Sequence, residues 1–138
     1  MAKITAVMTD LSKAEKGVWA DYAEGIQLCI ASIDNPEYKK RRAAILKPHQ
    51  RERRTGSINN ETVLDMLKPA IAKHVLVGWK NIEDESGKPL EYSAETALEF
   101  LRDPALSDLY YFVLEIAGEA GMYRRGILEE SVKNSLKP

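Results

Sequence analysis

The sequence is poor in the residues that build disulfide frameworks and metal centres. It contains one cysteine, Cys29, and two histidines, His49 and His74, in 138 residues. A lone cysteine cannot form an internal disulfide, and the two histidines lack the spacing of a zinc-ligand pair. The sequence therefore predicts a reducing compartment and no bound metal or cofactor.

Long apolar runs and an excess of one charge are also missing. No run approaches the roughly 18 apolar residues that span a bilayer, and no basic start leads into the apolar core of a secretion signal. The formal net charge is −1, which argues against a general electrostatic attraction to nucleic acid or anionic lipid. We expect a soluble intracellular protein with no membrane partner.

Catalytic signatures are absent from the sequence as well. It holds no HExxH, CxxC, GxSxG or phosphate-binding-loop pattern. Paired acids such as Glu83 with Glu85 fit a solvated charged face better than acid–base chemistry. We therefore expect no enzymatic activity and no catalytic residue.

The sequence does contain segments with periodic apolar residues, separated by turn and helix-capping residues. Residues 1–17 have no strong period and are expected to form an N-terminal arm or edge strand. Apolar and polar residues alternate from Val18 to Ile30 around Gly25, which predicts a β-hairpin. A single helix over 19–33 is the alternative.

The first predicted helix begins at Asn35 and Pro36. Asn caps well, and Pro at the first helical position gives up an amide that has no partner there. The helix is expected to end at about Lys47, because Pro48 follows. Residues 49–57 are polar and basic and are expected to form a mobile linker.

A second helix is predicted to begin at Asn59 or Asn60. Apolar residues spaced by three or four follow, and we expect this stripe to continue to Trp79, which then closes the core. Pro69 interrupts the stripe, so the segment is predicted to be kinked there or divided into two helices.

An acidic turn and two further helices complete the prediction. Residues 83–86 reverse the chain, and Ser93 is expected to cap a short helix over 93–102. The last long segment has a heptad-like apolar pattern after Asp103 and Pro104: Leu106, Leu109, Val113, Ile116, Ala120, Tyr123 and Ile127. It is either a buried helix or a self-association seam, with Gly118 and Gly121 as close-approach points or a break.

These segments predict a mainly α fold, a compact helical domain of four to five helices with a small N-terminal β-hairpin. Residues 18–138 are expected to form one domain, because a chain of this length has one hydrophobic core.

Charge is unevenly distributed along the chain. Basic residues crowd the first helix and the predicted linker: Lys39, Lys40, Arg41, Arg42, Lys47, Arg51, Arg53 and Arg54. Acids dominate from Glu83 to Glu119. Complementary patches steer association without a net charge, so Arg41, Arg42, Arg53 and Arg54 are candidate partner-binding residues for an acidic protein or a second copy.

Several short blocks occur in a specific order along the chain. They are Gly17-Val18-Trp19, Asn35-Pro36-Glu37-Tyr38, Gly78-Trp79-Lys80-Asn81-Ile82, Gly87-Lys88-Pro89-Leu90 with Tyr92-Ser93, and Lys133-Asn134-Ser135. In this order the sequence resembles the small tail assembly chaperones of long, non-contractile-tailed bacteriophages. The resemblance makes Trp19, Asn35, Pro36, Tyr38, Gly78, Trp79, Gly87, Pro89, Ser93, Lys133 and Asn134 candidate structural motif residues.

The resemblance implies a non-enzymatic assembly factor in the cytoplasm of the infected host. Such chaperones bind the apolar tape measure protein, keep it soluble, help to recruit tail tube subunits and are absent from the mature virion. In this family a longer form made by ribosomal frameshifting often adds the tube-binding part. Weak self-association is also expected.

Two hypotheses from other classes remain open. The basic segment 39–54 could serve a nucleic-acid-binding packaging or regulatory protein, although only Tyr38 is near enough for base stacking and no known reader motif follows. The chain could also be an enzyme subunit whose partner supplies the chemistry. Steep salt dependence of binding would identify the nucleic-acid hypothesis.

Overall fold

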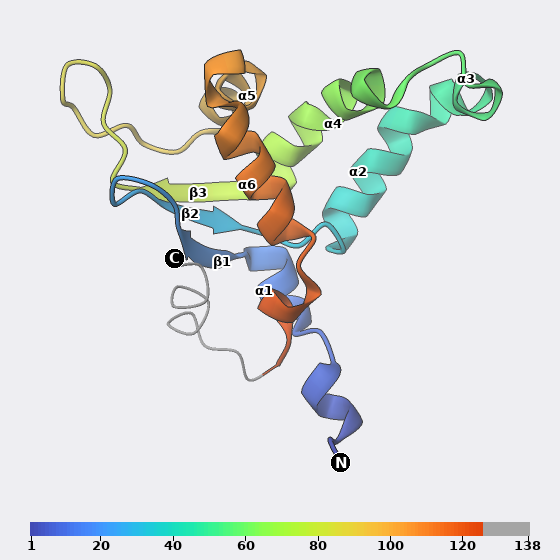
Figure 1. Ribbon diagram of the computed structural model, residues 1–138, viewed down its shortest axis with the longest axis horizontal. Helices are drawn as coiled ribbons and strands as arrows, with labels where there is room; N and C mark the ends of the chain where they lie inside the picture. Colours follow the sequence, from blue (N-terminus) through green and yellow to red (C-terminus); the bar gives the residue numbers. More distant parts are fainter. Residues whose placement is uncertain (126–138) are drawn as a thin grey trace.

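The computed structural model describes residues 1–125 of the chain. In this part a three-stranded sheet lies among helices that come from both halves of the sequence (Figure 1). The α-helices are α1 (Leu11–Lys16), α2 (Pro36–Leu46), α3 (Gln50–Thr55), α4 (Asn60–His74), α5 (Ala94–Arg102) and α6 (Ser107–Ala117), and the strands are β1 (Val18–Asp21), β2 (Gln27–Ile30) and β3 (Leu76–Lys80). Short 3-10 helices occur at η1 (Ile4–Val7), η2 (Lys47–His49), η3 (Pro104–Leu106) and η4 (Ala120–Tyr123). The predicted mainly α class is confirmed.

The predicted hairpin is present and gains a third strand. β1 and β2 pair antiparallel with Val18 opposite Ile30, and β2 pairs antiparallel with β3 so that Leu28 lies opposite Trp79. The prediction that the second helix continues to Trp79 is therefore wrong. Gly78 and Trp79 belong to a strand, because the free edge of β2 supplies backbone partners that the sequence does not reveal locally.

The N-terminal residues contain a short helix in place of the expected arm or edge strand. The Asp10 side chain accepts hydrogen bonds from the backbone amides of Ser12 and Lys13 and so caps α1. Thr9 forms an isolated antiparallel bridge with Arg124. This bridge brings the N-terminal segment beside the end of the described chain.

The predicted basic linker at 49–57 is also folded. Pro48 lies in the first turn of η2, where no amide is needed, and α3 follows directly. Gly56 ends α3 with a left-handed φ of 74°, which glycine adopts without strain. The linker prediction was wrong because it treated polar composition as evidence against a helix.

Two more helices differ from the predictions in length or continuity. α4 is a single helix with Pro69 inside it, so it is not divided into two. α6 ends at Ala117, and its last turn is followed by Gly118 and then η4. Gly118 thus marks a break, whereas the predicted periodicity runs on to Ile127, which lies outside the described residues.

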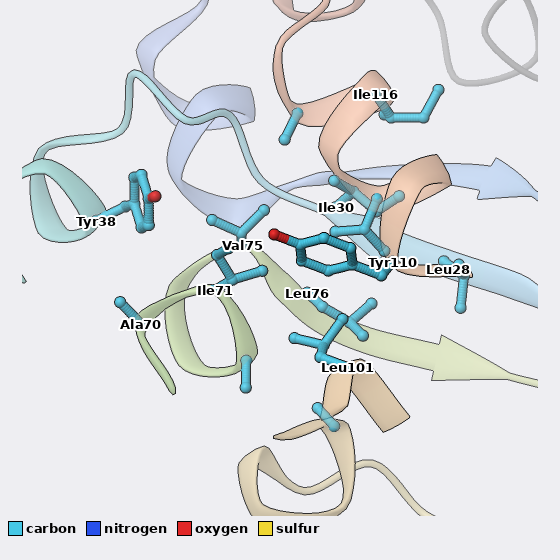
Figure 2. Packing of buried hydrophobic residues seen from close by; sticks show 14 of the residues in the cluster. Leu28, Ile30, Tyr38, Ala70, Ile71, Val75, Leu76, Leu101, Tyr110 and Ile116 are labelled. Carbon is cyan, nitrogen blue, oxygen red and sulfur yellow. The ribbon is translucent and has the colours of Figure 1, made fainter. Parts of the chain in front are cut away.

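The core packs α4, α5 and α6 against the sheet (Figure 2). Ile30, Leu76 and Tyr110 meet there, and the heptad-pattern residues Val113 and Ile116 are buried in the same cluster. The last helix is therefore a buried helix, since its apolar face is used within its own fold. The predicted core position of Trp79 is confirmed by an exposed fraction of 7%.

Candidate binding groove

Helices α2 and α4 pack side by side (Figure 1). A groove beside them is lined by residues of α2, α3, α4 and α6. Its volume is about 690 Å³. The lining residues are Ile33, Asp34, Tyr38, Lys39, Arg42, Arg53, Asn60, Val63, Leu64, Leu67 and Leu114. Apolar side chains from the loop before α2, from α4 and from α6 therefore meet basic side chains from α2 and α3.

Asn35 fixes the geometry of this groove. Its Oδ1 accepts from the Tyr38 amide at 2.9 Å, and its Nδ2 donates to the carbonyl oxygens of Ser32 at 2.6 Å and His74 at 3.1 Å. One buried side chain thus caps α2 and ties it to the end of α4. Nearby, the Ile33 amide donates to the Ala117 carbonyl at 3.1 Å, which holds the same loop against α6.

The apolar part of the groove is partly open to solvent. Leu64 is 42% exposed and Ile33 is 38% exposed, whereas Leu67, which also lines the groove, is buried. Val63 and Leu114 are half-buried. Large apolar side chains that gather in one open concave site are typical of an interaction surface.

The rim of the groove is basic. The Lys39 Nζ lies 3.6 Å from the Asp34 Oδ1, but Arg42 and Arg53 form no ion pair with any residue of the 1–125 range. Burial raises the pKa of Tyr38, and the positive charge of Arg42 opposes part of this rise. Arg42 therefore places a positive potential beside the Tyr38 ring at the groove.

The structure separates the four arginines that the sequence singled out. Arg42 and Arg53 line the groove, whereas Arg41 acts electrostatically on His74 and Arg54 lies with Arg53 and Gln50 around a more open depression. The candidate site thus contains two of the four.

His74 is half-buried at the end of α4. Burial lowers its pKa, and the neighbouring Lys73 and Arg41 lower it further against an opposing effect of Glu37. Among residues 1–125 no group of three or more metal-ligating side chains is present, and no helix in that range is long and apolar enough to cross a membrane.

The motif residues before the acidic turn have structural roles. The Trp19 ring is half-buried beneath the Lys80 ammonium, which lies 4.1 Å from the ring centroid. Pro36 begins α2 after the Asn35 cap, and Tyr38 is buried. Gly78 lies opposite Cys29, where an added Cβ would contact the Cys29 Cβ at 3.4 Å.

The motif residues of the acidic turn build a corner. Gly87 has a left-handed φ of 83°, and Pro89 bridges to Glu83. The Ser93 hydroxyl accepts from the Thr96 amide at 3.1 Å, which confirms the predicted cap of α5. Lys133 and Asn134 lie outside the described residues.

Sequence reasoning missed the floor of the groove. Leu64 belongs to the apolar stripe predicted after Asn59 and Asn60, and the sequence pattern does not mark Ile33 or Leu114 as binding residues. The spacing of apolar residues in α4 places Leu64 on the same face as Leu67, one turn before it. It does not predict that Leu64 is exposed, because that exposure depends on the positions of α2 and α6.

Comparison with known proteins identifies a family to which the sequence is similar. The family model described as YdaY prophage protein matches residues 33–134, a range that includes every lining residue of the groove. No curated protein and no solved structure matches the chain.

Proposed function

Because the chain belongs to the YdaY prophage protein family, we propose that it acts in phage assembly as a non-enzymatic tail assembly chaperone. In this role it binds the tape measure protein, keeps it soluble and helps to recruit tail tube subunits. Weak self-association, a longer frameshifted form that binds the tail tube, action in the host cytoplasm and absence from the virion belong to the same proposal.

The groove is the observation that supports this function best. An assembly chaperone for a long helical protein must cover apolar side chains reversibly, and a helix-in-groove contact does so. Leu64 and Ile33 provide exposed apolar area, and α2, α4 and α6 hold it in a fixed concave shape. The order of sequence blocks typical of tail assembly chaperones supports the proposal independently.

Co-expression with the tape measure protein tests the proposal. We expect wild type to keep the tape measure protein soluble and Leu64→Glu to abolish this effect, because a carboxylate on the groove floor opposes apolar contact. Leu11→Glu is the matched control, since Leu11 is a more exposed leucine on α1, away from the groove. Circular dichroism checks that both variants fold. Insoluble tape measure protein with wild type, or full activity of Leu64→Glu, would contradict the proposal.

The nucleic-acid hypothesis retains one supporting observation, the exposed basic side chains of α2 and α3. A gel-shift titration at several salt concentrations distinguishes it. Phosphate binding through Z basic groups lowers log K with a slope of about −0.9Z against log salt on duplex DNA. Tight binding with such a slope, together with an insoluble tape measure protein, would favour a packaging or regulatory role.

A further inference from the structure

The walls of the groove restrict the backbone conformation of its guest. Its lining residues come from helices α2, α3, α4 and α6 and from the loop before α2, and no strand residue is among them. An extended peptide would find no sheet edge to pair with, so its backbone groups would lose water without gaining partners. A helix satisfies its own backbone, and the groove therefore favours a helical guest.

The rim restricts the charge of that guest. Three basic side chains and one acidic side chain line the groove, and the acid, Asp34, already lies near Lys39. This leaves the guanidinium groups of Arg42 and Arg53 without a carboxylate partner in residues 1–125. Guanidinium groups form their strongest contacts with carboxylates in bidentate geometry. A helix with acids beside its apolar stripe complements this rim.

A second copy of the chain is a poorer guest. The acidic helices α5 and α6 bury their apolar faces in their own core, as Leu101 and Val113 show. Residues 1–11 do expose Ile4, Val7 and Leu11, but their one acid is Asp10, which caps α1. Among residues 1–125, α1 exposes Leu11 but carries Lys13 and Lys16 beside its one acid, Glu15, and α6 exposes Tyr111 as its one large apolar side chain, so neither offers an aliphatic stripe with a net acidic flank.

On the basis of the proposed function, we infer that the groove binds an acidic amphipathic helix of a partner protein, with its apolar stripe on Leu64 and Ile33 and its carboxylates on Arg42 and Arg53. In the tape measure protein this guest is a segment with acids flanking the apolar stripe. A helix with basic flanks is rejected, because it places like charges against the rim.

Two labelled helical peptides of about 20 residues provide the test, since isolated helices of that length form more readily than shorter ones. They share one leucine stripe and differ in having Glu or Lys beside it. Fluorescence anisotropy with the full chain measures both affinities. We expect the Glu peptide to bind at least about tenfold more tightly than the Lys peptide.

Two double charge-reversal variants test which arginines cause the preference for the Glu peptide. Arg42→Glu with Arg53→Glu is expected to invert the preference, whereas Arg41→Glu with Arg54→Glu has the same net charge and is expected to preserve it. Equal binding of the two peptides, no binding of either, or an equal response to both double variants would overturn the inference. Dissociation of a wild-type dimer by the Glu peptide in sedimentation would do so too, by making a second copy the occupant.

The peptide test and the co-expression test fail independently. If the tape measure protein stays soluble but the peptides show no charge preference, only the acidic character of the guest is wrong. If the groove selects the Glu peptide but the tape measure protein stays insoluble, the proposed chaperone function is wrong and the acidic helix belongs to another partner.

Discussion

Trp79 joins the sheet to the segment that leads into α5. Its indole Nε1 donates to the Leu90 carbonyl at 2.8 Å. The Tyr92 ring meets it edge-on at a centroid distance of 5.0 Å, and the Phe100 ring lies at 5.2 Å. One side chain therefore holds β3, the strand-to-helix connection and α5 together.

Replacing this side chain should be costly. We expect Trp79→Ala to lower the free energy of unfolding by about 3 to 5 kcal/mol, because it leaves a cavity and removes a partly buried hydrogen bond. Urea denaturation measures the change. Trp19→Ala is the control: its ring is half-buried under Lys80, and we expect a loss of about 1 kcal/mol. A loss below about 1 kcal/mol for Trp79→Ala would show that these contacts do not stabilise the fold.

Helices α2 and α4 begin with the same kind of cap in different surroundings. Asn35 is 1% exposed and also donates to Ser32 and His74, whereas Asn59 is exposed and accepts one hydrogen bond, from the Thr62 amide at 2.8 Å. The first cap thus fixes how two helices meet, and the second stabilises only its own helix.

Alanine at each cap separates these two roles. We expect Asn59→Ala to cost about 1 kcal/mol, the usual value of a lost cap. Asn35→Ala should cost about 2 to 4 kcal/mol, because the half-buried His74 carbonyl also loses the Nδ2 donor, while the Ser32 carbonyl keeps only the Asn35 backbone amide at 3.1 Å. Thermal melts or urea titration compare the two variants. Equal losses would show that Asn35 does not couple α2 to α4.

The sequence predictions succeeded where the signal lies in neighbouring residues and failed where it depends on distant ones. The caps at Asn35 and Ser93 and the hairpin of β1 and β2 depend on neighbouring residues, and all are confirmed. β3 was missed because Val75 and Trp79 also fit helical spacing, and only pairing with β2 makes this segment a strand. Non-local pairing leaves no mark within a short window.

For the candidate groove, the sequence predicted the basic residues but not the apolar ones. Its basic residues form a run in the sequence, so Arg42 and Arg53 could be named in advance. Its floor joins Ile33, Leu64 and Leu114, which come from three separate segments. No pattern within one segment distinguishes such residues from ordinary core residues, because their exposure is decided when the helices pack.

Charge and apolar surface are arranged together across the molecule. The basic helices α2 and α3 border the groove, and the acids of α5 and α6 lie on helices whose apolar faces are buried. Arg42 and Arg53 therefore lie beside the accessible aliphatic side chains Ile33 and Leu64, whereas α6 exposes Tyr111 as its one large apolar side chain. The groove thus presents basic and apolar groups together, as the proposed acidic helical guest requires.

Several tyrosines make the stability of the fold depend on pH in the alkaline range. Burial raises the pKa of Tyr38, Tyr92 and Tyr110 above its usual value. For Tyr22 burial, the hydrogen bond to Asp108 and the charge of that carboxylate raise the pKa from 10.0 to about 12. The Tyr22 hydroxyl donates to the Asp108 Oδ2 at 2.5 Å, and its ring lies 4.9 Å from that of Phe112. The Tyr22 hydroxyl can thus donate to the Asp108 carboxylate of α6 only while it is protonated.

The direction of the pH effect follows from proton binding in the two states. Between pH 10 and about 12 the unfolded chain has lost the Tyr22 proton and the folded chain keeps it, so the unfolded state binds fewer protons and stability falls as pH rises. The contribution of Tyr22 is complete below its unfolded pKa and is lost as pH passes its folded pKa. We expect urea midpoints to decrease from about pH 9 to about pH 12, less steeply for Tyr22→Phe. Lysine deprotonation is common to both proteins, so the difference between the two slopes isolates Tyr22. Parallel slopes would show that Tyr22 titrates alike in the folded and unfolded states and that its contact with Asp108 does not stabilise the fold.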